Sequence, residues 1–171
     1  YLPNLLFFRF FPLVLAYNLN LVISYLLASL GTYLFTRKMG LSSISSFFAA
    51  FIFTFSGFLA VHLNHFNLIQ AASLLPLVFW SALFLWEKPK LKYSILAAFF
   101  ISQQIFTGHF YIVFITCIGL FLFWLGKILF EKRNNLRKKL VFISLSFVIT
   151  FIFSAIQLLP TIELWQLSQR S

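Results

Sequence analysis

The side chains of this chain that could bind a substrate form a small group of imidazoles, amides and ions set among long apolar runs. Two histidines lie three residues apart, at His62 and His65, and the third is His109. The other members of the group are Gln104, Gln157, Glu163 and Arg170. Imidazole and amide groups suit phosphate and sugar oxygens, and an arginine can clamp a phosphate. We therefore take these seven residues as candidate substrate-binding residues.

Three interpretations of the histidines are open. Histidines three apart can share one face of a helix, and together with His109 they could hold a metal ion. No zinc signature such as His-Glu-x-x-His occurs, however, so we assign no residue to a metal. The histidines could instead lie at a lipid–water interface and bond to backbone or headgroups. As the third interpretation, they could contact the phosphate or sugar of a substrate.

The carboxylate Glu163 has two interpretations of its own. Arg170 follows seven residues later, on the same side of a helix, so the two side chains could form an ion pair. Alternatively, Glu163 could be a general base or hold a sugar hydroxyl, although a single carboxylate is thin support for acid–base catalysis. The chain has no aspartate, and the catalytic residues stay unknown.

The composition excludes a soluble globular protein. The chain is 61% hydrophobic and only 9% charged, whereas soluble domains are about one quarter charged. So much apolar surface needs lipid to cover it. The net charge of +10 would suggest nucleic acid in a soluble protein. Here the basic residues form short clusters between apolar runs, so we predict contact with a lipid bilayer and no nucleic acid.

The elements that must position the candidate residues are membrane-spanning helices. A span needs about 20 apolar residues in a helix, and barrel strands would alternate in polarity. The runs here are apolar on all sides. We predict an all-α, polytopic transmembrane helix bundle of about six spans, forming a single transmembrane domain over residues 1–171. The expected spans are residues 12–35, 45–61, 68–86, 93–107, 110–130 and 140–158.

The charges then fix the predicted orientation. Nearly all of the 13 lysines and arginines lie in the connections after the first, third and fifth spans, and only Arg9 and Arg170 lie on the other side. Cytoplasmic connections carry the excess of Lys and Arg. We therefore predict a multi-pass protein of the cytoplasmic membrane, with the candidate residues toward the outer surface.

The order of several short motifs along the chain is similar to that of YfhO-type bacterial membrane proteins. The resemblance covers essentially the whole chain. It is carried by Tyr1–Leu6, Gly31–Phe35 before Arg37 and Lys38, Phe55–Phe58 with the following His62, Leu74–Leu77, Thr107–His109 and Ala155–Leu164.

This resemblance implies a glycosyltransferase of the GT-C type. Such an enzyme takes a sugar from a polyprenyl-phosphate donor and modifies a cell-envelope polymer on the outer side of the membrane. The family resemblance places the catalytic aspartate in the first external loop. We accordingly expect the catalytic residue upstream of Tyr1, and the chain to be a fragment that lacks that loop and the N-terminal helix. No definite cofactor is implied, and a divalent metal is left open.

Two other functions are left open by the sequence. A transporter or lipid flippase component would place polar residues near the bilayer midplane, whereas here they gather toward one leaflet. A non-catalytic membrane scaffold is the other alternative, since the chain has no aspartate.

Overall fold

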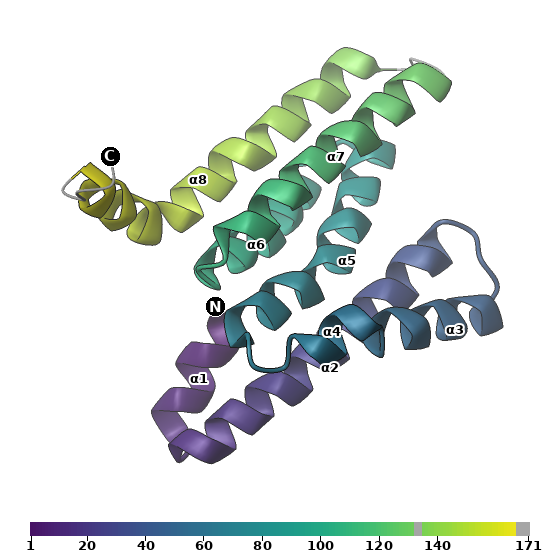
Figure 1. Cartoon of the computed structure of the whole chain (residues 1–171). Coiled ribbons are helices and arrows are strands. Elements are labelled where there is room, and N and C mark those ends of the chain that lie inside the picture. The colour runs from purple at the N-terminus through teal and green to yellow at the C-terminus, as the bar shows by residue number, and fades with distance from the viewer. Residues whose placement is uncertain (132–134, 167–171) are drawn as a thin grey trace.

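The computed structural model describes residues 1–131 and 135–166, and this described part is built of eight α-helices without a strand (Figure 1). The helices are α1 (Leu2–Phe10), α2 (Leu13–Lys38), α3 (Ser43–Thr54), α4 (Gly57–Val61), α5 (Phe66–Glu87), α6 (Leu91–Phe106), α7 (Phe110–Phe130) and α8 (Leu136–Gln166). The predicted all-α class is confirmed.

Five helical segments of the described chain are long and apolar enough to cross a membrane. They are α2, the pair α3–α4 taken together, α5, α7 and α8. The sixth predicted span corresponds to α6, an apolar helix of 16 residues. A bundle of about six spans is therefore confirmed, and α8 is the helix whose bounds differ most from the expected ones.

Two local features differ from the expectation. Residues before Pro12 were left outside the spans, but they form the short helix α1, which packs against α2. The span expected over residues 45–61 is divided, because the backbone leaves the helix at Phe55 and a new helix starts after Ser56. Proline at the start of α1 suits its first turn, where no N–H bond is lost.

Helix α5 is the central helix of the bundle. It packs against α2, α6, α7 and α8. Of the residues in its apolar 18-residue stretch, 72% are buried, against 22% in the corresponding stretch of each of the other four spans. Its serines satisfy their hydroxyls within the helix, as Ser81 does with the carbonyl of Val78. A Cβ at Gly31 of α2 would lie 2.8 Å from the Leu77 Cγ of α5. The missing side chain therefore lets these two helices approach closely.

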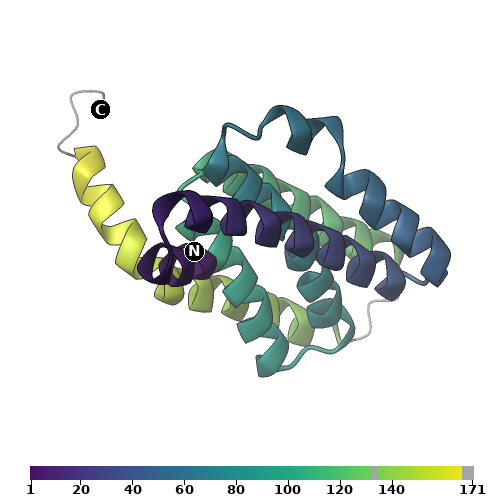
Figure 2. The same cartoon turned by 90° about the horizontal axis from the view of Figure 1, so that it is seen from below.

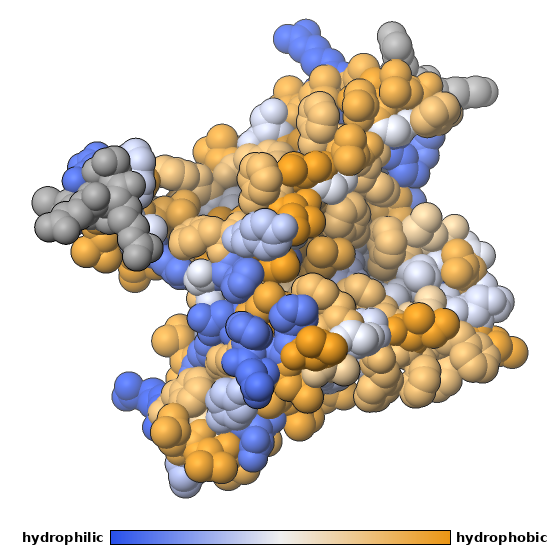
Figure 3. Space-filling view, in the orientation of Figure 1, coloured by the Kyte–Doolittle hydropathy of each residue, from blue (hydrophilic) through white to orange (hydrophobic). Residues whose placement is uncertain are grey.

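Because the spans alternate in direction, the bundle has two chemically different ends. The cationic end is formed by the ends of α2, α5 and α7 and the starts of α3, α6 and α8; the histidine end is formed by α1, the end of α6 and the starts of α5 and α7 (Figure 1). On the face seen in Figure 3, hydrophilic residues gather over the α4–α5 connection and its surroundings, within a mostly hydrophobic surface.

Side-chain pairs close the cationic end. Lys38 at the end of α2 forms an ion pair with Glu87 at the end of α5. The buried Trp86 donates its indole N–H to Glu131 at 2.7 Å, and the Lys139 ammonium lies 4.1 Å from the Trp86 ring centroid. Glu131 also accepts a hydrogen bond from Lys127, and chiefly for that reason its pKa lies below the ordinary value. Helices α2, α5, α7 and α8 are thereby joined at this end.

Candidate functional site

Three hollows in the described structure lie at the histidine end. They have volumes of about 490, 450 and 320 Å³. Each is lined by at least one histidine or amide side chain, and none by an acidic one. The candidate residues are therefore distributed over three neighbouring depressions instead of meeting in one pocket.

The smallest hollow brings His65 and His109 together, and Asn67 from the first turn of α5 also lines it. His65 precedes the first turn of α5 and His109 precedes the first turn of α7, and neither side chain caps its own helix. The first N–H groups of both helices thus stay without a side-chain cap. Two helix N-termini bring positive partial charge to this hollow and imidazoles can donate hydrogen bonds, so the hollow favours an anion.

The turn before α7 depends on a glycine. Gly108 has a φ of +77°, a conformation that L side chains rarely adopt. This turn places His109 half-buried, with its Nδ1 atom buried and without a hydrogen-bond partner in the described structure. A buried polar atom of this kind normally binds a partner, and the His109 side chain also lines the hollow.

The largest hollow holds His62 at its polar end. The His62 Nδ1 atom lies 2.7 Å from the carbonyl oxygen of Phe58, so Nδ1 is the protonated donor of this bond. The His62 and His65 ring centroids are 5.6 Å apart. The rest of the hollow is an apolar groove between α3–α4, α5 and α7, lined mainly by Phe53, Leu59, Leu68, Leu75, Ile112 and Ile115.

The third hollow is lined by amides from three helices. Asn4 of α1, Gln103 of α6 and Gln157 of α8 face it. Asn4 forms a double hydrogen bond with the buried Gln70 of α5, at 3.1 and 2.6 Å. The Gln103 side-chain oxygen accepts from the backbone N–H of Leu2 at 2.8 Å. These bonds fix α1 against α5 and α6.

Asn4 and Gln103 are site residues that sequence reasoning did not select. The available signal was weak, because it consisted only of isolated amides within apolar runs. Gln157 was selected, and the structure places it in this hollow. Its neighbour is Gly108, where an added Cβ would come within 3.9 Å of the Gln157 Nε2 atom.

The other candidate residues lie elsewhere. Gln104 is fully buried and donates to the Ala71 carbonyl at 2.8 Å, so it joins α6 to α5 and lines none of the three hollows. Glu163 is exposed on the last turns of α8, beyond Pro160, where α8 projects past the rest of the bundle (Figures 1 and 2). Arg170 lies outside the described residues, and so does the predicted Glu163–Arg170 pair.

The histidines do not form a metal centre in the part of the chain that the structure describes. Within residues 1–131 and 135–166, no three His, Cys, Asp or Glu side chains gather as ligands. His62 and His109 belong to different hollows, although His65 lies near both.

The comparison with protein families assigns the chain. The model of the family described as "Bacterial membrane protein YfhO" matches residues 3–170. No curated protein and no solved structure matches the chain. Since the match covers almost the entire sequence, and the structure has several apolar helices able to span a membrane, the chain belongs to the YfhO family of bacterial membrane proteins.

Proposed function

We propose that this chain forms the donor-binding part of a membrane-embedded glycosyltransferase. The enzyme would take a sugar from a polyprenyl phosphate and transfer it to a cell-envelope polymer on the outer side of the membrane. The observation that carries the proposal is the pair of imidazoles, His65 and His109, set at two helix N-termini in one hollow. This arrangement suits the phosphate of a lipid-linked donor.

The neighbouring apolar groove supports a lipid-linked donor in particular. His62 stands at the polar end of a groove of about 490 Å³ whose remaining lining is nearly all hydrocarbon. A polyprenyl phosphate is arranged in the same order, with an anionic head followed by a long apolar chain. The phosphate would lie near His62, His65 and His109, and the first isoprene units would follow the groove.

The amide-lined hollow supports binding of the sugar or the acceptor. Sugar hydroxyls both donate and accept hydrogen bonds, and so do amides such as Gln157 and Gln103. Helix α1 forms one wall of this hollow through Asn4. We assign the hollow to the polar, non-lipid part of the reacting molecules.

The proposed chemistry breaks the bond between the sugar C1 and the phosphate oxygen and forms a bond from C1 to an acceptor oxygen. Negative charge grows on the leaving phosphate, and the imidazoles and helix N-termini would stabilise it. The proton of the acceptor hydroxyl needs a base. No acidic side chain lines the three hollows, so we assign donor binding, and not the base, to this chain.

The test is sugar transfer by the full-length protein carrying His65→Ala or His109→Ala. Losing a hydrogen bond to a charged phosphate should lower the rate by roughly 10- to 100-fold, with unchanged thermal stability. Asn64→Ala is the matched control, because Asn64 is exposed in the same connection and should keep full activity. Wild-type rates in both histidine variants would remove the site assignment. If the protein moved the substrate into vesicles without transferring its sugar, transport would replace glycosyl transfer as the proposed function.

A further inference from the structure

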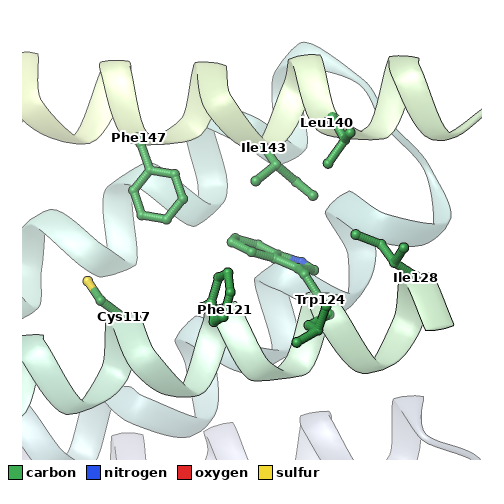
Figure 4. Close-up of a pocket in the computed structure, with 8 residues that line it drawn as sticks. Cys117, Phe121, Trp124, Ile128, Leu140, Ile143 and Phe147 are labelled. Atoms are coloured by element: carbon green, nitrogen blue, oxygen red, sulfur yellow. The ribbon is translucent and has the colours of Figure 1, made fainter.

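A groove separates α7 from α8 near the cationic end. These two helices are consecutive and antiparallel, yet α7 packs mainly on α5 and α6, and α8 packs mainly on α6. The space between them has a volume of about 260 Å³ and an almost wholly apolar lining (Figure 4). Its main lining residues are Cys117, Phe121, Trp124, Ile128, Ile143 and Phe147.

The side chain of Trp124 is the one strong hydrogen-bond donor of this groove. Its indole projects from α7 into the space between the helices and packs edge-on against Phe147, with ring centroids 5.9 Å apart. Trp124 is 7% exposed, and its Nε1 atom is buried without a hydrogen-bond partner in the described structure. Figure 4 shows this nitrogen on the side of Ile128 and Leu140, which is the side of the cationic end.

An unpaired N–H at membrane depth is costly, because neither lipid chains nor apolar side chains accept a hydrogen bond. Buried indoles normally find an acceptor. An acceptor oxygen supplied by a bound molecule would remove this cost at Trp124. The groove therefore suits a ligand that is apolar over most of its length and carries an oxygen acceptor where it passes the Trp124 N–H.

Positive charge lies beside the same end of the groove. Arg137 precedes Leu140 by three residues, so the two share a face of α8; Lys138 is its neighbour, and both basic side chains are exposed. The chain has only three acidic residues. Glu87 pairs with Lys38, Glu131 pairs with Lys127, and Glu163 lies near the opposite end of α8. Among the residues that the structure describes, no carboxylate side chain is left to neutralise Arg137 and Lys138.

We propose that the α7–α8 groove binds one anionic glycerophospholipid from the leaflet on the cationic side. An acyl chain fills the groove, an ester carbonyl accepts the Trp124 N–H, and the headgroup phosphate lies at Arg137 and Lys138. Trp124 lies six residues before Phe130, the last residue of α7, and therefore roughly 9 Å from the cationic end of that helix along its axis. The bound lipid would lie deeper than its neighbours in the leaflet, with its ester group drawn into the groove.

The test measures phospholipid retention by native mass spectrometry. The full-length protein in detergent is titrated with dioleoyl phosphatidylglycerol or, in parallel, dioleoyl phosphatidylcholine. The wild type should retain one phosphatidylglycerol with a preference of roughly tenfold or more, since each basic residue near the headgroups adds about 1 kcal/mol. Trp124→Phe keeps an aromatic ring but loses the N–H donor, and should weaken retention of both lipids about fivefold.

Two further variants separate the headgroup from the groove. The double variant Arg137→Gln, Lys138→Gln should lose the preference for phosphatidylglycerol and keep phosphatidylcholine binding. Ile143→Trp should fill the groove and remove both. Trp165→Phe is the matched control, because Trp165 is exposed near the other end of α8, and it should match the wild type. Thermal unfolding monitors the fold of each variant.

Three results would overturn the proposal. Equal retention of the two lipids by the wild type would show that the groove does not recognise an anionic headgroup. Wild-type retention by Trp124→Phe would remove the indole as a ligand. A lipid-free dimer that Ile143→Trp dissociates would identify the groove as a contact between two copies of the chain.

Discussion

The two ends of the bundle use their polar side chains in opposite ways. At the cationic end, Glu87 and Glu131 are each engaged by a lysine, and Glu131 also accepts from Trp86. At the histidine end, His65 and His109 face an open hollow, and the Nδ1 atom of His109 has no partner in the described structure. The carboxylates of the cationic end are engaged by side chains of the bundle, whereas the imidazoles of the histidine end line a hollow that is open to an incoming molecule.

This difference shows that polarity alone does not mark a site in a membrane protein. The cationic end holds most of the charge of the chain, yet its buried Trp86 has both a hydrogen-bond acceptor and a cation over its ring. The histidine end has little formal charge but holds two long helix N-termini without side-chain caps. The availability of a donor distinguishes the candidate site better than the density of charge does.

The largest expected effect comes from removing the side chain of Trp86 at the cationic end. Trp86→Ala should destabilise the protein by about 3–5 kcal/mol, because it leaves a large cavity and removes both the indole donor to Glu131 and the ring beneath Lys139. Thermal unfolding in detergent measures the loss. Trp165→Ala, at an exposed tryptophan near the histidine end, should change stability little. Equal losses in the two variants would contradict the closing role of Trp86.

A second change targets the pair of amide side chains at the histidine end, Asn4 and Gln70. Asn4→Ala leaves the amide of Gln70 without its double hydrogen bond, which should cost about 1–3 kcal/mol. We expect α1 to loosen, so limited proteolysis should cut faster at the connection between α1 and α2. Asn18→Ala is the control, because Asn18 is exposed on α2. Equal cleavage rates in the two variants would show that the amide pair does not hold α1.

The smallest expected effect is a pH dependence confined to the cationic end. The pKa of Glu131 lies below its ordinary value near 4.5, mainly because Lys127 donates to it. Its folded pKa is thus lower than its unfolded one, so its contribution is fully present above the ordinary value and is lost as the pH falls through the folded value. The side chain is largely in solvent, so the effect should stay below about 1 kcal/mol.

Thermal unfolding between pH 3 and pH 6 would measure this contribution. The variant Glu131→Gln should lose less stability than the wild type over the acid part of that range. Glu163→Gln should behave like the wild type, since Glu163 has no ion-pair partner among the described residues. A wild-type acid profile in Glu131→Gln would show that the Lys127 contact contributes nothing.

The sequence predicted the spans because the length of each apolar run can be read directly from the order of the residues. The expected bounds of α5 and α7 agree with the structure within two residues. The break between α3 and α4 was missed, since Phe55 and Ser56 lie in an apolar run that hydropathy treats as continuous. Helix α1 was missed because nine residues are too few to register as a span.

The candidate site was predicted only in part, because hydropathy does not fix the rotation of a helix about its axis. Gln103 and Gln104 are adjacent, and we selected Gln104 as the candidate although hydropathy does not distinguish the two. In the structure Gln103 faces a hollow, whereas Gln104 turns into the contact with α5. The meeting of His65 and His109 follows from the pairing of two helix starts, which becomes visible only when the helices are packed.

The length of α6 has a consequence for the membrane around the protein. Its 16 residues span roughly 24 Å, less than the hydrocarbon thickness of about 30 Å. Such hydrophobic mismatch is relieved by thinning of the adjacent lipid. If α6 is anchored at the cationic end, its other end is recessed below the surrounding bilayer surface. A lipid-borne substrate could then reach this dip by lateral diffusion, whereas a water-soluble polymer would have to descend into it.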